Sequence, residues 1–167
     1  MPLVTAKNVR DGRMDYTNTD WVSYETATKA WQRCRPQVGD ILLVCVGATT
    51  GRLCVIRDSK EMVLVRSVAL IRPNDTISAD FFAVVLRSPM CQMQIWNKVK
   101  VTAQPCLYIN RINSLVIPLP PSAEQHRIVA KVGGLMALCD QMEARLNTTA
   151  TARRQFLETT ISEALAP

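Results

Sequence analysis

The sequence predicts an α+β (mixed α/β) domain over residues 1–119, followed over residues 120–167 by a long C-terminal α-helix or a helical hairpin suited to coiled-coil pairing. Three observations predict this arrangement. Short apolar runs alternate with turn residues in the first part, a proline cluster interrupts the chain at residues 118–121, and apolar residues then recur with heptad spacing.

Continuous apolar runs predict buried strands in the first part. Residues 41–46 read Ile-Leu-Leu-Val-Cys-Val without a polar residue, which is typical of a strand covered on both faces. A Gly-Ala-Thr-Thr-Gly turn follows, and the apolar pattern resumes at residues 52–57. Residues 62–65 and 67–71 supply two further strands before Pro73 and Asn74.

The pattern becomes helical after this strand region. Within residues 78–87 the apolar side chains are spaced to share one helix face, and Pro89 is expected to start a second short helix that continues to Trp96. A last strand is expected at residues 114–117. The proline cluster that follows cannot continue a strand, so we expect the domain to end there.

A capping box is expected to start the C-terminal helix. Ser122 should accept from the Gln125 amide while the Gln125 side chain reaches back to the serine N–H. The positions that follow form an a/d seam for helix pairing, which weakens near Thr148 and then resumes, so that one long helix and a hairpin are both open. The predicted helix-pairing residues are Ile128, Val132, Leu135, Cys139, Met142, Leu146 and Phe156.

Composition narrows the classes of function. The chain carries a net charge of +6: residues 1–120 hold fifteen Lys/Arg and nine Asp/Glu, whereas residues 121–167 hold five of each. A basic globular part favours a polyanionic partner such as nucleic acid. The sequence has no long apolar run and no leader pattern, so a cytoplasmic protein is expected.

The sequence contains no motif that predicts catalysis or metal binding. The six cysteines include no Cys-x-x-Cys pair and should be free thiols, and His126, the single histidine, is expected at a solvated helix start rather than as a general base. Gly47 to Arg52 is one residue short of a phosphate-binding P-loop. We therefore expect no metal site, no bound cofactor and no enzymatic activity of the chain itself.

Three loops of the basic part carry candidate DNA contacts. Each combines Lys or Arg, which neutralise phosphates, with amides or hydroxyls, which can hydrogen-bond to base edges; ordinary solvated loops are the alternative. The predicted DNA-binding residues are Lys7, Asn8, Arg10, Arg13, Thr49, Thr50, Arg52, Lys98, Lys100 and Gln104.

Nearly the whole sequence resembles the specificity (S) subunits of type I restriction–modification systems. The junction Ile-Pro-Leu-Pro-Pro-Ser-Ala-Glu-Gln at residues 117–125, continuing through Ile128, is similar to the point where a target-recognition domain of this family enters its conserved helical region. Gly39-Asp40-Ile41-Leu42 with Gly47 and Gly51, and Gln104-Pro105 with Leu107, also resemble the family.

The resemblance implies a non-catalytic subunit that reads double-stranded DNA. Two recognition domains, joined by antiparallel helices, would each read one half of a split target. Methyltransferase (M) subunits carrying S-adenosylmethionine would perform DNA methylation, and the restriction (R) subunit would bind through them.

One recognition domain is present, so we expect a half or truncated subunit that forms a homodimer or pairs with another half-specificity subunit. The chain begins inside what resembles the first strand region of such a domain. The alternative is a truncated module of the same assembly that binds protein partners but not DNA.

Overall fold

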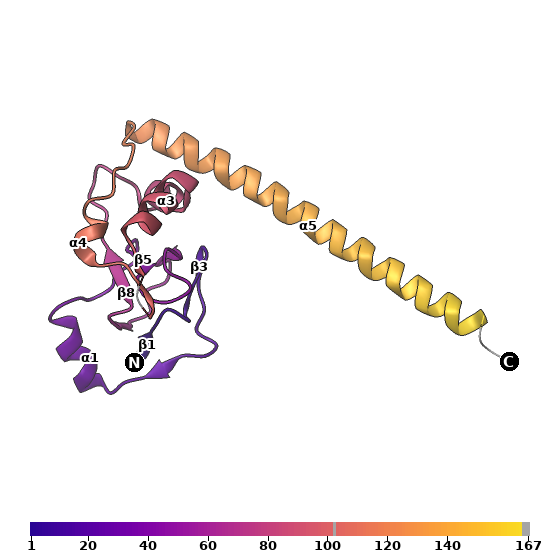
Figure 1. Cartoon of the computed structure of the whole chain (residues 1–167), viewed down its shortest axis with the longest axis horizontal. Helices are drawn as coiled ribbons and strands as arrows, with labels where there is room; N and C mark the ends of the chain where they lie inside the picture. Colours follow the sequence, from indigo (N-terminus) through magenta and orange to yellow (C-terminus); the bar gives the residue numbers. More distant parts are fainter. Residues whose placement is uncertain (102, 165–167) are drawn as a thin grey trace. The chain divides into compact units, whose positions relative to one another are not determined.

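The structure, a computed structural model, describes residues 1–101 and 103–164, with the side chains of residues 1–100 and 103–158 (Figure 1). The chain divides into two units, Met1–His126 and Arg127–Pro167. Strands and helices both occur in the first unit, and a long helix forms the second, which confirms the predicted fold class. The prediction that residues 1–119 form a domain by themselves stays a prediction.

A three-stranded antiparallel sheet lies at the centre of the first unit. Its strand order is β6-β5-β8, formed by β6 (Leu53–Val55), β5 (Ile41–Val44) and β8 (Val68–Ile71). Leu42 of β5 lies opposite Cys54 on one side and Leu70 on the other. The apolar runs are therefore strands, as predicted, and the structure shows that they pair as neighbours in one sheet.

Strand β5 is buried on both faces, because it separates two apolar clusters. Ile41 and Leu43 face one cluster, which includes residues of α2 (Ala79–Arg87) and α3 (Pro89–Lys98). Leu42 and Val44 face the other cluster. Successive side chains of a strand point to opposite faces, so an uninterrupted apolar run is what such a position requires.

Serine caps define the starts of α2 and α3. The Ser78 hydroxyl accepts from the Phe81 amide at 3.1 Å, and the Ser88 hydroxyl accepts from the Cys91 amide at 3.3 Å. Pro89 occupies the first turn of α3, where its missing N–H costs no hydrogen bond. Both predicted helices are confirmed.

Several short elements were not predicted from the sequence, because each is too short for a periodic pattern. Two of them are β1 (Pro2–Val4) and β4 (Asp20–Trp21), which pair antiparallel; β1 also pairs parallel with β7 (Val63–Leu64), a strand predicted at residues 62–65. The remainder are the hairpin strands β2 (Val9–Arg10) with β3 (Arg13–Met14) and β9 (Lys100–Val101) with β10 (Pro105–Cys106), and the helices α1 (Tyr24–Trp31) and α4 (Ile109–Ile112).

The strand predicted at residues 114–117 is wrong. This segment follows α4 in an irregular conformation, and its Val116 backbone is paired by a side chain of α3. The Gln94 side chain accepts from the Val116 N–H at 2.9 Å and donates to the Val116 carbonyl at 2.8 Å. A glutamine amide thus takes the place of a neighbouring strand.

Helix α5 runs without interruption over Ser122–Ala164, so the hairpin alternative is wrong (Figure 1). The predicted capping box does not form. The Gln125 amide donates to the Pro121 carbonyl at 3.1 Å, and the Gln125 side chain, 1% exposed, lies among polar groups of the first unit. Its three backbone partners, at residues 76, 78 and 120, satisfy the buried amide more completely than the expected reach back to Ser122 would.

The cysteines of the chain are free thiols, as predicted, and three of them, Cys45, Cys54 and Cys91, are buried. Within residues 1–101 and 103–164, no helix combines the length and the apolar character that crossing a membrane requires.

Candidate nucleic-acid interface

The structure brings two of the three predicted loops together. The β2–β3 hairpin lies against the start of β6, where the Gly12 N–H donates to the Leu53 carbonyl at 3.2 Å. Next to this contact, the Arg52 guanidinium approaches the Asp11 carboxylate, with 3.6 Å between Nε and Oδ2. Residues 7–13 and 49–52 therefore contribute to one surface, although their separation in the sequence does not reveal it.

The loop between β5 and β6 is a tight, internally bonded turn. Gly47 and Gly51 adopt φ values of +96° and +93°, a region that favours glycine because it has no Cβ atom. Thr50 is buried, and its hydroxyl donates to the Gly47 carbonyl at 2.7 Å. The turn therefore presents Thr49 and Arg52 outward, whereas Thr50 stabilises its interior.

Helix α3 anchors this loop through Gln92. The Gln92 side-chain amide donates to the Gly51 carbonyl at 3.0 Å and to the Leu86 carbonyl at 2.7 Å. A Cβ atom on Gly51 would lie 2.6 Å from the Gln92 side-chain oxygen. The loop and α3 therefore fit closely only because residue 51 is glycine.

A polar cleft of about 430 Å³ lies between the hairpin and the loop, lined in part by Asp11, Thr49, Arg52, Arg87 and Gln92. Arg87 comes from the end of α2 and donates to the Leu53 carbonyl at 3.3 Å. Sequence reasoning missed Asp11, Arg87 and Gln92. Their local sequence carries no signal, because only the packing of the β2–β3 hairpin on β6 and of α2 and α3 on the sheet brings them to this loop.

The third predicted loop joins the opposite side of the β5–β6 turn. The Gly47 N–H donates to the Pro105 carbonyl at 3.0 Å, at the start of β10. Lys100 and Gln104 are exposed on this hairpin, and Lys98 is half-buried at the end of α3. Residues 47–53 thus contact the first loop at Arg52 and Leu53 and the β9–β10 hairpin at Gly47.

The cations of the first loop are exposed and ion-paired. Lys7 lies 2.8 Å from Asp20, and Arg10 lies 3.2 Å from Asp15. Hydrogen bonds from the hydroxyl and the amide of Thr17, and then from Arg10, lower the pKa of Asp15 to about 2. Asp15 is therefore ionised at neutral pH. Arg13 is exposed at the start of β3.

Asn8 does not have the position expected of a DNA contact. It is 1% exposed, and its side-chain oxygen accepts from the Thr5 amide at 2.9 Å. Its side-chain nitrogen donates to the carbonyls of Asp15 and Asn18 and to the Thr19 hydroxyl. Asn8 holds the first loop together, and its hydrogen-bonding capacity is used within the chain.

A second cationic concavity, of about 990 Å³, lies at the other edge of the sheet and was not predicted. Its lining includes Arg33, Arg35, Arg66 and Arg72. Arg72 is held in place by Asp40, whose side chain is 2% exposed, through two hydrogen bonds of 2.8 and 2.7 Å. These arginines lie far apart in the sequence, so no local cluster signals them.

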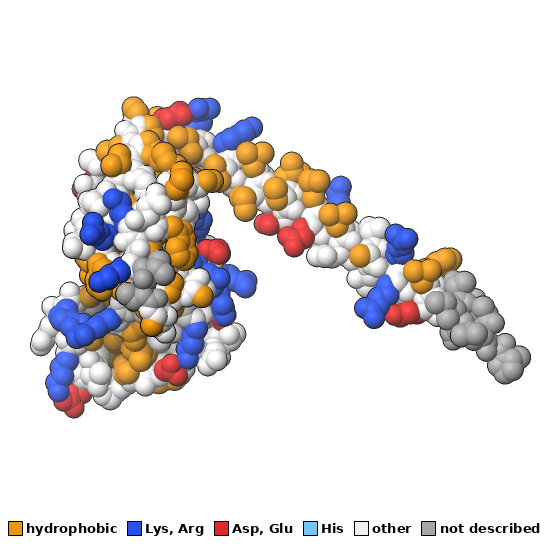
Figure 2. Space-filling model, in the orientation of Figure 1, with side chains coloured by type: hydrophobic (Ala, Val, Ile, Leu, Met, Phe, Trp, Pro, Cys, Tyr) orange, Lys and Arg blue, Asp and Glu red, His pale blue; other side chains and the backbone are white. Residues whose placement is uncertain are grey.

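The seam of α5 is a second surface that differs in chemistry from the cleft. Ile128 and Val132 are half-buried, and the remaining predicted positions, Leu135, Cys139, Met142, Leu146 and Phe156, are exposed. Hydrophobic side chains recur along the visible side of this helix (Figure 2). An exposed apolar series of this length is typical of a helix that pairs with another.

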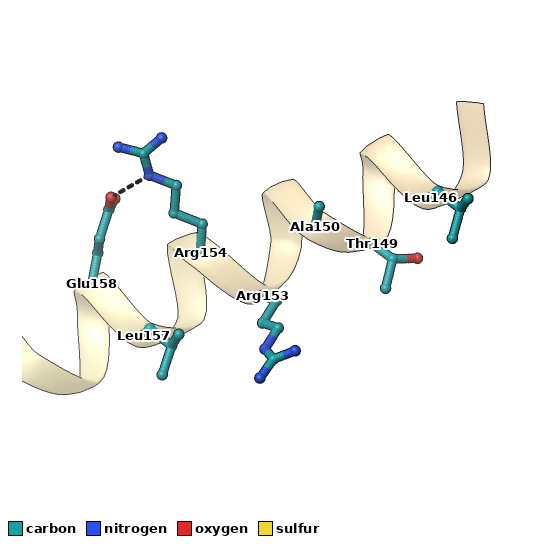
Figure 3. A pocket seen from close by; sticks show the side chains of 7 residues that line it. All are labelled: Leu146, Thr149, Ala150, Arg153, Arg154, Leu157 and Glu158. Carbon is teal, nitrogen blue, oxygen red and sulfur yellow. Dashed lines mark hydrogen bonds and ion pairs between the residues drawn. The ribbon is translucent and has the colours of Figure 1, made fainter. Parts of the chain in front are cut away.

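The seam becomes more polar toward its end. A shallow depression of about 470 Å³ is lined by residues 146–158, and Figure 3 shows Leu146, Thr149, Arg153 and Leu157 pointing to the same side of the helix. Arg154 forms an ion pair with Glu158 at 2.9 Å within the helix. Thr149 and Arg153 interrupt the apolar series, so the strongest pairing surface lies before residue 147.

Residues 4–152 match the family described as type I restriction modification DNA specificity domain. The chain is 28% identical over 163 residues to the type I restriction enzyme EcoBI specificity subunit of Escherichia coli, covering 97% of this chain and 34% of that protein. Identity to the EcoKI specificity subunit of Escherichia coli strain K12 is 25% over 169 residues, covering 98% and 36%.

A solved structure has the same fold. The HsdS subunit from Thermoanaerobacter tengcongensis superposes with a TM-score of 0.59 at 25% identity, covering 80% of this chain and 35% of that one. The chain therefore spans about a third of the length of the relatives that it matches.

Proposed function

Since this chain belongs to the type I restriction modification DNA specificity family, we propose that it is a sequence-specific DNA recognition subunit of a type I restriction–modification system. The first unit reads one half of a split target on double-stranded DNA. Helix α5 supplies the surface for assembly with methyltransferase subunits.

The observation that carries this proposal is the meeting of two cationic loops at one polar cleft. Arg52 and Arg87 line the cleft beside the β2–β3 hairpin. Cationic side chains position a protein on the phosphates, and polar groups between them can contact base edges. The family match, which extends through all three predicted loops, favours DNA reading over the alternative of a module that binds only proteins.

We assign the exposed cations Lys7, Arg10, Arg13 and Lys100, and the half-buried Lys98, to phosphates. Lys7 and Arg10 would exchange an exposed carboxylate partner for a phosphate, at little cost because solvent screens surface ion pairs. Thr49, Arg52 and Gln104 are assigned to base edges. Burial of Asn8 and Thr50 leaves these two residues with a supporting role in the loops.

Helix α5 would pair along its seam with a second copy of the chain or with another half-specificity subunit. Pairing would cover the exposed apolar positions Leu135, Met142 and Leu146. A symmetric pair would present two identical recognition units and would select a palindromic, interrupted target.

The partner subunits would catalyse the reactions on DNA. The methyltransferase subunits would bind S-adenosylmethionine and methylate a flipped base, and the restriction subunit would associate through them. This chain would contribute the choice of site and the scaffold, without a catalytic side chain.

The test is co-expression of the chain with its methyltransferase subunit in a host that lacks DNA methylation, followed by genome-wide sequencing of modified adenines. A palindromic, interrupted motif is the expected result and would establish DNA reading by a homodimer. An asymmetric motif would indicate pairing with a different half. An assembled complex that modifies no site would contradict DNA reading and support the protein-binding alternative.

A further inference from the structure

The Asp11–Arg52 pair at the cleft is loose and accessible. The Arg52 Nε and Asp11 Oδ2 atoms are 3.6 Å apart, longer than an ordinary hydrogen bond, and the side chains are 28% and 71% exposed. Within the described part of the chain, neither side chain has another hydrogen bond or ion pair. Both groups therefore retain nearly all of their hydrogen-bonding capacity for a ligand.

A neighbouring ion pair shows the contrasting arrangement. The Asp15 carboxylate accepts from Arg10 at 3.2 Å and also from the amide and the hydroxyl of Thr17, at 3.1 and 2.6 Å. The Asp15 carboxylate oxygens therefore already accept hydrogen bonds from residues of its own loop. Asp11 lies on the same hairpin, yet its carboxylate is directed to the cleft rather than to the loop.

The walls around Arg52 are held by backbone contacts. Arg87 donates to the Leu53 carbonyl, and Gln92 donates to the Gly51 carbonyl. Arg52 itself follows the Gly51 turn and is only partly exposed. The backbone on both sides of Arg52 is thus held in place before any ligand binds, which lowers the entropic cost of a specific contact by its side chain.

A carboxylate beside the guanidinium is unfavourable for a phosphate, because the two anions repel. It is favourable for a base edge that offers a donor next to two acceptors. In the major groove, guanine presents the acceptors N7 and O6, and its paired cytosine presents the N4 donor beside them. An arginine fork matches the first two atoms and a carboxylate matches the third.

We propose that Asp11 and Arg52 together read a single G·C base pair of the target, with Arg52 on guanine and Asp11 on cytosine. This inference rests on the proposed DNA recognition and assigns the chemistry of one position in the target. A·T pairs do not offer two adjacent acceptors with a neighbouring donor in this order, so the pair would reject them.

The experiment compares the methylated motif of the wild-type complex with those of Asp11→Ala, Arg52→Gln and a control, Arg57→Gln. The control removes one arginine charge at the other end of β6, where Arg57 pairs with Asp80 on the surface. Wild type is expected to require a G·C pair at one position that both cleft variants relax. Discrimination at that position should fall by about tenfold to a hundredfold, with the remaining positions unchanged.

Three results would overturn the inference while leaving DNA recognition intact: a motif unchanged in both cleft variants, relaxation at two different positions, or a uniform loss of methylation without a change of motif. The last would mean a phosphate or structural role for Arg52. A wild-type complex that assembles and modifies nothing would instead contradict the proposed function. If Arg52→Gln fails to assemble, Asp11→Ala decides alone, because its exposed side chain supports no other contact.

Discussion

The side-chain oxygen of Gln125, in the first turn of α5, accepts a hydrogen bond at 2.9 Å from the backbone N–H of Ser78, the residue that caps α2. The side-chain nitrogen of Gln125 donates to the carbonyls of Thr76 and Pro120, at 2.9 and 3.0 Å. One buried amide therefore joins the start of α5, the proline segment and the start of α2.

Replacing this amide should destabilise the first unit. Gln125→Leu keeps an apolar stem but removes the hydrogen-bond partner of the Ser78 N–H and of the Thr76 and Pro120 carbonyls, so the free energy of unfolding should fall by about 1–3 kcal/mol. Chemical denaturation of the wild type and the variant measures this free energy of unfolding. The control Gln141→Leu lies on the exposed part of α5 and should change it by less than about 0.5 kcal/mol. Equal effects of the two variants would refute a special role for Gln125.

Alanine substitutions at the two glycines of the β5–β6 turn should show separately the cost of backbone strain and the cost of crowding against Gln92. Gly47→Ala should cost about 1–2 kcal/mol, because φ is +96° and no atom lies within 4 Å of the new Cβ. Gly51→Ala meets Gln92 as well, and should cost about 1 kcal/mol more. A double-mutant cycle with Gln92→Ala tests this. If the cost of Gly51→Ala is the same with and without Gln92, the crowding explanation is incorrect.

Two lysines near the third loop should contribute to the salt dependence of DNA binding. Lys98→Gln/Lys100→Gln removes two assigned phosphate contacts, so the slope of log K against log salt should become shallower by about 1.8. Equilibrium titration of the assembled complex with a target duplex at several salt concentrations measures the slope. The control Lys29→Gln/Arg57→Gln removes two charges from surface ion pairs and should leave the slope unchanged. An unchanged slope in the first variant would exclude these lysines from the interface.

Thiol reactivity should distinguish the cysteines. Burial raises the pKa of both Cys45 and Cys54 to about 11, so these thiols stay protonated and inaccessible, whereas Cys139 is exposed on the α5 seam. Cys139 should react rapidly with a maleimide at low protein concentration and more slowly as pairing covers the seam. Cys45 and Cys54 should react only on unfolding. Rapid modification of either in the folded protein would contradict the two-sided burial of the sheet.

The raised pKa values also predict a dependence of stability on pH. An unfolded thiol ionises near pH 9, whereas the folded thiols remain neutral until about pH 11. The contribution of these groups to stability is therefore complete below about pH 8 and is lost as the pH rises toward 11. Denaturation of the wild type and of Cys45→Ala at pH 8 and pH 10 measures this loss, which should be smaller in the variant.

The two glycines of α5 should affect the helix but not its pairing. No neighbouring atom lies within 4 Å of a Cβ added at Gly133 or Gly134, so alanine at either position should stabilise the helix by about 1 kcal/mol. Leu135→Ala, one residue further along, should instead weaken pairing. Thermal unfolding and analytical ultracentrifugation measure the two effects. Loss of pairing in Gly133→Ala would place the seam on a different face.

Local sequence patterns determined the central sheet and the longer helices. The apolar run at residues 41–46 predicted a strand buried on both faces, and the Ser-Pro pattern at residues 88–89 accompanied a confirmed helix start. The proline cluster and the heptad spacing predicted a helix that begins at Ser122 but left one long helix and a hairpin both open; the structure has one helix. These features depend on backbone preferences and on which side chains avoid water, and both act within a few residues of the chain.

Tertiary structure alone decided which polar groups became partners. Gln125 could have completed a capping box, but backbone groups of residues 76, 78 and 120 were available to it, and Gln94 paired the Val116 backbone in place of a strand. Asp11 and Arg52 likewise meet only because the first hairpin packs on β6. A hydrogen bond needs its partner within about 3.2 Å and an ion pair within about 4 Å, and a sequence pattern carries no information about which distant segment arrives there.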